Sequence, residues 1–370
     1  MSMRESSAAL RHFAQGLGVF ASAIGAIACA HSDEPGGGDE ATAGNGGAAA
    51  GAAGSSVSSA GARAGATNGG SLAGAGAGAS NGSGISGGAS AGTAGQPTNG
   101  GSTSGGAMGG DSPTMLPTAT ETCPAIQSGN MTFLGQSVTV WAGAPAASSG
   151  GPLVIYWHAT GGVPQEAVSG LGQPAIDEII AQGGMVAAQA QTTGMGTNTG
   201  NNVWFTGDFA VADEIVACAI EQLHIDVRRI YASGFSAGGL QTAWMSYERS
   251  GYLAAVVPYS GGLTGLAGIV LTPTETPQDP SNVPAAMAVH GRAGADVVVL
   301  DFAVQSLAYL DDVNAKGGFG VECDHGGGHS IPSTMPASTW QFLKAHAFKT
   351  KPSPYAAGLP ASFPEYCKIH

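Results

Sequence analysis

The sequence predicts an α/β fold in which helices cover both faces of a mostly parallel β-sheet. Apolar runs of strand length alternate with amphipathic stretches of helix length between residues 137 and 348. The runs are continuously apolar, which is typical of strands that are buried on both faces. Residues 119–370 number about 250, enough for one domain with a large core.

Each expected element can be read from this alternation. Strands are expected at residues 137–141, 152–158, 185–191, 229–234, 254–259, 285–290 and 319–323. Helices are expected at residues 174–182, 209–223, 237–247, 302–316 and 336–348. A ligand binds such a sheet in the crevice at the carboxyl ends of the strands. Functional residues are therefore expected in the loops that follow strands.

Residues 31–118 differ from the rest of the chain in composition. Glycine supplies 62 of the 370 residues, and this stretch is almost wholly Gly, Ala, Ser, Thr and Asn. Such a composition cannot bury a core, so we expect a disordered linker. A flexible coil of this length has an end-to-end distance of about 50 Å. It separates a folded domain, residues 119–370, from the amino terminus.

The first 30 residues have the pattern of a signal peptide. Arg4 and Arg11 are followed by an apolar run, residues 16–28, that is too short to span a bilayer. Cys29 comes next, as in a bacterial lipoprotein signal, although Ala26 replaces the usual leucine. We expect either an outer-membrane-anchored lipoprotein with its lipid on Cys29 or a freely secreted protein.

The charge balance excludes one class of partner. The chain carries 12 Lys and Arg against 25 Asp and Glu, a formal net charge of −13. This charge repels phosphate backbones, so nucleic-acid binding is excluded as the main function. The acidity favours solubility, and we expect a monomer.

Four cysteines remain in the folded domain, and an even number in an exported protein indicates disulfides. Three connectivities are available. We prefer a bridge between Cys123 and Cys367, which open and close the domain, with Cys218 and Cys323 as the second pair. The alternative is buried free thiols. The chain has no C-x-x-C pair, which disfavours a zinc site.

Residues 234–238 read Gly-Phe-Ser-Ala-Gly and match the G-x-S-x-G nucleophile elbow. In this motif the serine lies on a sharp turn between a strand and a helix, so its neighbours must be small, and backbone N–H groups at the helix start converge on it. The expected strand and helix flank Ser236. Residues 84–88 match the same pattern without either element, so Ser236, and not Ser86, is the candidate nucleophile.

In a hydrolase with this motif, an acid and then a histidine follow the serine, each after a strand. Asp296 follows the strand that ends at His290 and is the leading candidate for the acid. Asp301 is the alternative, although it equally fits the N-cap of the next helix. His329 lies between the last strand and the closing helix and is the candidate base.

His325 and His329 are separated by three glycines. Histidines four residues apart bind a metal ion when they lie on a helix, and three glycines disfavour a helix. We therefore expect no metal site. His325 fits a surface residue beside a tight turn.

Backbone N–H donors must stabilise the oxyanion of an acyl-transfer reaction. One is the N–H of Ala237, which follows the candidate nucleophile, and the other comes from the loop after an early strand. Thr160 is the expected donor there, and His158 is expected to be structural. Trp204 and Phe205 are candidates for the wall of a substrate groove, with a structural role as the alternative.

Four segments carry a family resemblance. They are Tyr-Trp-His-x-x-Gly-Gly at 156–162, Asp-Val-Arg-Arg-Ile-Tyr at 226–231 leading into Gly-Phe-Ser-Ala-Gly-Gly at 234–239, His-Gly at 290–291, and Gly-Gly-His-Ser-Ile-Pro at 327–332. Through them, residues 123–348 resemble the polyhydroxybutyrate depolymerase and feruloyl esterase group of secreted α/β-hydrolases. The resemblance implies Ser236, Asp296 and His329 as the triad, and Thr160 and Ala237 as the oxyanion hole.

Two positions depart from the pattern of that group. Ala159 stands where a glycine is usual, and the spacing His-Gly-x-x-Asp would put the acid at Gly294. Asp296 therefore requires a two-residue insertion, which keeps Asp301 as an alternative.

We expect an exported serine carboxyl-ester hydrolase that needs no cofactor. Its ester substrate is small or polymer-linked, of the feruloyl, acetyl or polyhydroxyalkanoate type. The alternatives are a surface-displayed binding module without turnover and a serine peptidase. The complete triad order argues against the binding module. Residues 261–283 are too few for a large cap, which leaves an open crevice suited to esters on polymers.

Overall fold

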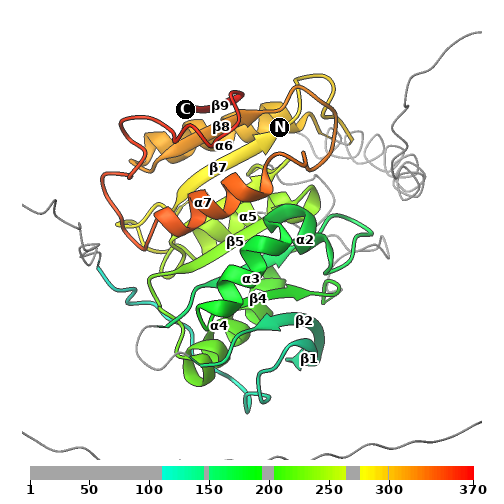
Figure 1. The fold of residues 1–370 in the computed structure, drawn as a ribbon, viewed down its shortest axis with the longest axis vertical. Coiled ribbons are helices and arrows are strands. Elements are labelled where there is room, and N and C mark those ends of the chain that lie inside the picture. Colours follow the sequence, from blue (N-terminus) through cyan, green and yellow to red (C-terminus); the bar gives the residue numbers. More distant parts are fainter. Residues whose placement is uncertain (1–110, 146–149, 194–203, 264–275, 299) are drawn as a thin grey trace, which may run out of the picture. The chain divides into compact units, whose positions relative to one another are not determined.

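The structure is a computed structural model that describes residues 111–145, 150–193, 204–263, 276–298 and 300–370. One sheet of nine strands organises these residues, in the order β1-β2-β4-β3-β5-β6-β7-β8-β9 (Figure 1). The strands are β1 Gly129–Phe133, β2 Gln136–Ala142, β3 Leu153–Trp157, β4 Met185–Gln189, β5 Ile230–Phe235, β6 Ala255–Tyr259, β7 Ala285–His290, β8 Gly320–Asp324 and β9 Cys367–Ile369. The strands from β4 to β8 in this order are mutually parallel, whereas β1, β2 and β9 pair antiparallel at the two edges.

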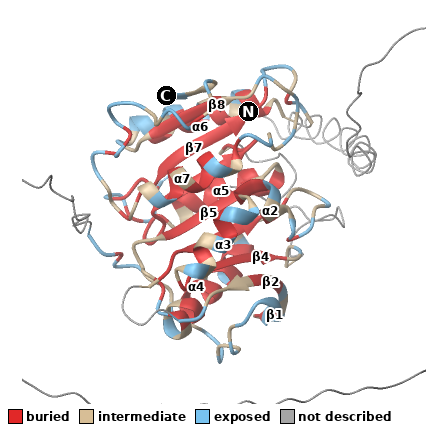
Figure 2. Ribbon diagram, viewed as in Figure 1, coloured by how far each residue is buried: buried red, intermediate tan, exposed pale blue. Residues whose placement is uncertain are grey.

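The burial of the central strands explains their sequences. Every residue of β3, β4, β6 and β7 is buried. Figure 2 shows β4 and β7 in the red of buried residues. Alternate side chains of a strand face opposite sides of the sheet, so strands covered on both sides must be apolar throughout. The prediction of a mostly parallel sheet covered on both faces is confirmed.

Helices cover each face and bury a separate cluster of apolar side chains. Three helices pack with Leu153, Ile155 and Trp157 of β3 on one face: α4 Phe209–Leu223, α5 Ala237–Glu248 and α6 Phe302–Ala315. Three more pack with Val154 and Tyr156 on the other: α2 Glu166–Leu171, α3 Gln173–Ala181 and α7 Pro336–Ala345. The short helices α2 and η1 Thr206–Asp208 were not predicted.

The edge strands β1 and β9 were also not predicted. β1 alternates between exposed and buried residues, and joins β2 through a two-residue turn at Leu134 and Gly135. Both residues have positive φ, of 48° and 73°, which matches the twist of a tight hairpin. β9 has three residues, too few for a recognisable pattern.

The predicted disulfide pairing is wrong. Cys123 is bonded to Cys218, and Cys323 to Cys367. β1 and β9 occupy opposite edges of a nine-stranded sheet, so residues next to them are separated by about 40 Å. A bridge between the two ends of the domain therefore cannot form. Instead β9 pairs antiparallel with β8, which puts Cys367 directly opposite Cys323.

The amino-terminal part of the described chain packs against α4. The backbone N–H groups of Thr120 and Glu121 donate to the Glu214 carboxylate at 2.7 and 3.0 Å. These bonds bring the chain before β1 alongside the helix that carries Cys218, which explains the first disulfide. Residues 1–110, with the predicted signal peptide, Cys29 and most of the linker, lie outside the described residues. In the described part, no helix is long and apolar enough to cross a membrane.

Candidate active site

Ser236 lies between β5 and α5, on a turn with unusual backbone geometry. Its φ is 58° and its ψ is −118°, a conformation that residues with a side chain rarely adopt. Such backbone strain persists only where the surrounding structure enforces it, and strained residues are frequent at functional sites. The Ser236 N–H donates to the Tyr259 carbonyl at 2.9 Å, which ties the turn to the end of β6. The turn therefore has the strand–turn–helix geometry that the sequence predicts around Ser236.

The two glycines of the motif allow α5 to approach β3. A Cβ atom on Gly238 would lie 1.8 Å from the carbonyl oxygen of Trp157, and one on Gly234 would lie 2.4 Å from the same oxygen. Either side chain would push the start of α5 away from the loop that follows β3. The motif glycines therefore bring Ser236 close to the loop that contains Thr160.

His329 connects Ser236 to a carboxylate. Its Nε2 lies 2.8 Å from Ser236 Oγ, and its Nδ1 lies 2.6 Å from Asp296 Oδ1. An ionised carboxylate can only accept, so Nδ1–H donates to Asp296 and Nε2 is left to accept the Ser236 proton. The rings of Phe235 and Phe302 lie 4.7 and 4.8 Å from the imidazole. These contacts fix the plane of the His329 ring.

The Asp296 carboxylate is fully buried and accepts three hydrogen bonds. Besides His329, Ser260 Oγ and the Gly291 N–H donate to Oδ2, at 2.8 and 2.9 Å. Burial alone would raise the pKa of Asp296, but the three donors outweigh it and hold the pKa below its ordinary value. The Asp296 carboxylate, which accepts from His329 Nδ1–H, is therefore an anion at neutral pH.

Asp301, the alternative acid, has a different role. It caps α6, with Oδ1 accepting from the N–H groups of Ala303 and Val304. Its Oδ2 accepts from the Gly294 N–H at 2.8 Å. Gly294 belongs to the turn between Gly291 and Asp296, in which the Asp296 N–H donates to the Arg292 carbonyl. This turn brings the Asp296 carboxylate to His329.

The loop after β3 is held by buried polar contacts. His158 is fully buried, with its ring nitrogens 2.8 and 3.0 Å from the carbonyls of Ala159 and Ala190. Burial lowers its pKa. The Ala159 N–H donates to Glu166 Oε1 at 3.1 Å, so Glu166 of α2 anchors the residue before Thr160. The start of this loop lies against the start of α5, because a Cβ atom on Gly238 would lie 2.7 Å from the His158 carbonyl oxygen. Ala237 is the first residue of α5, so its N–H has no intrahelical partner. The position of Thr160 as the second donor stays a prediction.

Trp204 does not line a groove, which corrects one expectation. Its side chain is 1 % exposed, and its Nε1–H donates to the His158 carbonyl at 2.7 Å. The indole therefore supports the loop after β3 from inside the core. Phe205 is half-buried, and its place in a substrate groove stays a prediction.

His325 is not paired with His329. Its Nδ1 accepts from the Gly327 N–H at 3.3 Å, within a turn. Burial lowers its pKa. Among the described residues, no three His, Cys, Asp or Glu side chains gather so as to hold a metal ion.

Sequence reasoning missed four side chains of this site: Ser260, Phe235, Phe302 and Glu166. Ser260 directly follows a predicted strand, so the sequence already indicated that it lies at the carboxyl edge of the sheet. Phe235 is the variable position of the motif before the serine. Phe302 contacts His329, which is distant in sequence, and Glu166 reaches back to Ala159 across a turn. No local sequence pattern indicated either contact.

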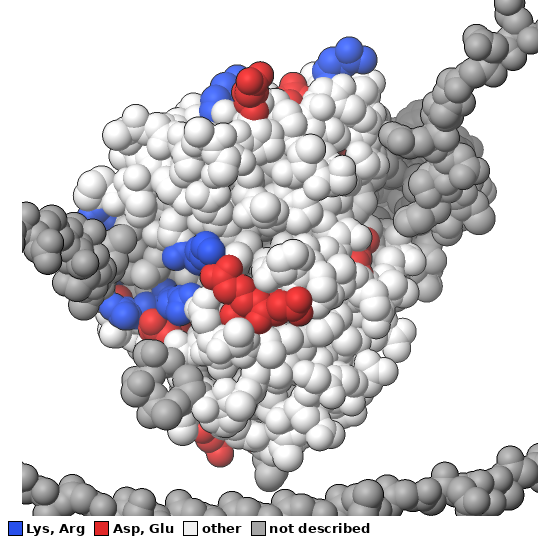
Figure 3. All heavy atoms as spheres, in the orientation of Figure 1, with Lys and Arg blue, Asp and Glu red and all other residues white. Residues whose placement is uncertain are grey.

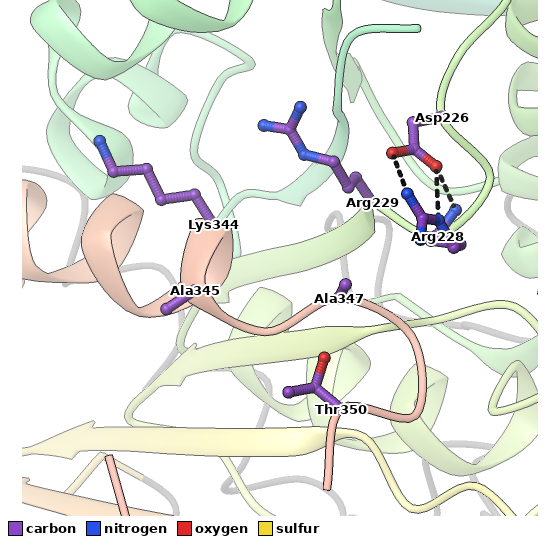
Figure 4. A pocket seen from close by; sticks show the side chains of 7 residues that line it. All are labelled: Asp226, Arg228, Arg229, Lys344, Ala345, Ala347 and Thr350. Atoms are coloured by element: carbon purple, nitrogen blue, oxygen red, sulfur yellow. Dashed lines mark hydrogen bonds and ion pairs between the residues drawn. The ribbon is translucent and has the colours of Figure 1, made fainter. Parts of the chain in front are cut away.

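A separate pocket of about 220 Å³ lies away from this site (Figure 4). It is lined by Asp226, Arg228, Arg229, Lys344, Ala345, Ala347 and Thr350. Arg229 precedes β5 and Ser236 follows it, so about 20 Å of strand separates the two. Arg228 pairs with Asp226, and Lys344 with Glu178. Figure 3 likewise shows charges of both signs side by side on a mostly uncharged face.

Comparison with known proteins identifies the fold. No family model and no curated protein matches the sequence. The solved structure described as pOPH native matches with a TM-score of 0.52 and 19 % identity, over 67 % of this chain and 96 % of that chain. A pOPH variant in complex with pNPB gives a TM-score of 0.52 and 19 % identity, over 67 % and 95 %. At such identities the likeness shows the fold, and the prediction of an α/β-hydrolase fold is confirmed.

Proposed function

We propose that this protein is a serine carboxyl-ester hydrolase with Ser236 as nucleophile, His329 as general base and acid, and Asp296 as the residue that orients His329. One observation carries the proposal. An unbroken hydrogen-bonded chain runs from Ser236 Oγ through the imidazole to a buried carboxylate, and it starts on a strained turn at a helix amino terminus. Nucleophilic catalysis by a serine needs this arrangement of base and orienting group.

The geometry supports a two-step reaction. Ser236 Oγ attacks the ester carbonyl carbon while its proton passes to His329 Nε2. The N–H groups of Ala237 and Thr160 donate to the oxyanion. The bond to the alcohol then breaks, and His329 returns the proton to the leaving oxygen. In the second step a water molecule gives a proton to His329 while its oxygen attacks the acyl carbonyl carbon. The bond to Ser236 Oγ then breaks, the carboxylic acid leaves, and His329 returns the proton to Oγ.

We further propose that the substrate is a small or polymer-linked acyl ester of the feruloyl, acetyl or polyhydroxyalkanoate type. The protein is exported, and either lipidated at Cys29 or freely secreted. The bonds Cys123–Cys218 and Cys323–Cys367 support export, because disulfides persist in oxidising compartments.

A fluorophosphonate probe and a panel of esters test this function. The panel contains short-chain p-nitrophenyl esters, methyl ferulate, acetylated xylan and a polyhydroxyalkanoate film. We expect the probe to label the wild type but not Ser236→Ala, and at least one ester to be hydrolysed. A protein that is neither labelled nor active is a binding module. A labelled protein that cleaves peptides but no ester is a peptidase.

A further inference from the structure

Ser260 is the first residue after β6, and its backbone is strained. Its φ is 45°, in the left-handed region that residues with a side chain rarely adopt. Its N–H donates to the Val289 carbonyl of β7 at 2.7 Å, and its side chain is fully buried. The left-handed turn directs the hydroxyl toward the triad, where Oγ donates to Asp296 Oδ2 at 2.8 Å.

This bond controls the orientation of the Asp296 carboxylate. Oδ1 receives the His329 Nδ1–H, while Oδ2 receives Ser260 Oγ–H and the Gly291 N–H. Rotation of the carboxylate would break both bonds to Oδ2 and leave buried donors without partners. Because unsatisfied buried donors are costly, Oδ1 stays aimed at His329.

The residue before Ser260 holds the nucleophile in the same way. The Tyr259 carbonyl accepts the N–H of Ser236 at 2.9 Å. A Cβ atom on Gly239 would lie 2.2 Å from that carbonyl oxygen, so the first turn of α5 rests on it. Two consecutive residues at the end of β6 thus fix the nucleophile and the acid relative to each other.

We propose that Ser260 is a positioning residue of the triad, which holds the Asp296 carboxylate against His329 through its hydroxyl. The inference rests on the proposed hydrolase function. When Ser236 gives its proton to His329, the resulting imidazolium is stabilised by a carboxylate that already points at Nδ1. A donor on Oδ2 also lowers the basicity of Asp296, which keeps the proton on the imidazole.

Three variants separate the hydroxyl from the backbone. Ser260→Ala removes the hydroxyl and keeps the strained backbone, whereas Ser260→Gly removes the hydroxyl and relieves the strain. Ser233→Ala is the matched control, because Ser233 is also fully buried and its Oγ donates to a backbone carbonyl, that of Val257. The readouts are kcat and KM for a soluble p-nitrophenyl ester, per active site titrated with the fluorophosphonate.

Both Ser260 variants should lose about 10- to 100-fold in kcat, the effect of one hydrogen bond to a charged group, with KM nearly unchanged. The acid limb of the kcat profile should move to higher pH, because a carboxylate that loses this donor is more basic and stabilises the protonated base His329 more strongly. Asp296 also acts electrostatically on His325. The pH profile of kcat is therefore measured for His325→Ala as well, to separate any effect of His325. Ser233→Ala should keep the wild-type kcat and profile.

Wild-type kcat in Ser260→Ala, or in Ser260→Gly if the alanine variant does not fold, would overturn the inference. A loss in the alanine variant with normal kcat in the glycine variant would assign the effect to the backbone, which also overturns it. A wild-type protein that hydrolyses no ester would instead refute the proposed function.

Discussion

His329 Nε2 lies 2.8 Å from Ser236 Oγ, although 93 residues separate them in the chain. The contact forms because β5 and β8 are parallel strands of one sheet, so the loops that follow them emerge at the same edge. The first prediction concerns this pair. Ser236→Ala should lower ester hydrolysis by about 10⁴-fold or more, since only the oxyanion hole and substrate binding remain.

Ser86 provides the control for that experiment. It has the same G-x-S-x-G pattern in the predicted linker, so Ser86→Ala should keep full activity. Turnover is measured with a soluble p-nitrophenyl ester. Near-normal turnover by Ser236→Ala would contradict the assignment of the nucleophile.

The two carboxylates after β7 should respond oppositely to substitution. Asp296→Asn should lower kcat by up to about 10⁴-fold, because an amide favours the wrong tautomer of His329. Asp301→Asn should keep kcat and lower stability by about 1 kcal/mol, because asparagine can still cap α6 but cannot at the same time accept from the Gly294 N–H. Measuring turnover and Tm for both variants decides between them. A catalytically dead Asp301→Asn enzyme would refute the assignment.

The two histidines after β8 should also differ. His329→Ala removes the group between Ser236 and Asp296, so its loss should approach that of Ser236→Ala. His325→Ala should retain most activity, because its ring contacts a turn. Assays of both variants, with and without a chelator, test this prediction. Equal losses together with inhibition by the chelator would indicate a metal pair instead.

Glu166 should make stability depend on pH. Burial raises its pKa from the ordinary value of 4.5 to about 7 in the folded protein. Between these values the folded state holds a proton that the unfolded state has lost, so the free energy of unfolding falls as pH rises through this window. Glu166→Gln keeps a side-chain oxygen that can accept from Ala159 and Tyr156 but cannot ionise.

The free energy of unfolding of Glu166→Gln should therefore not fall in this way as pH rises. Its Tm relative to the wild type should rise between pH 5 and pH 8, by an amount that corresponds to roughly 2–3 kcal/mol. Thermal unfolding of both proteins across this range is the measurement. A Tm difference that does not change with pH would mean that Glu166 has an ordinary pKa in the folded state.

The amino-terminal residues should be dispensable up to the described part of the chain. A protein that begins at Asp111 should fold and hydrolyse soluble esters at the wild-type rate, because the removed segment has no core-forming composition. One that begins at Thr120 should have a lower Tm, since Leu116 and Ala119 pack against the core. Loss of rate on a soluble ester in the longer protein would show that the linker contributes to the site.

The sequence by itself determined the class of fold and the elements near the site. Continuous apolar runs identify β3, β4, β6 and β7, because a strand covered on both faces leaves no polar position. The elbow at Ser236 was recognisable because its strand, its small neighbours and its helix are adjacent in the chain. The candidate base His329 followed from the order of elements alone.

Only the tertiary structure decided which distant groups meet. Asp296 and Asp301 are five residues apart and fit the same motif, and the turn at Gly294 brings the first to His329 while the second caps α6. The disulfide pairing depended on β9, three residues that form a strand only because β8 offers them an edge. Ser260 contacts Asp296 across a separation of 36 residues. Such pairings arise from sheet order and side-chain packing, which are properties of the whole chain and leave no local pattern.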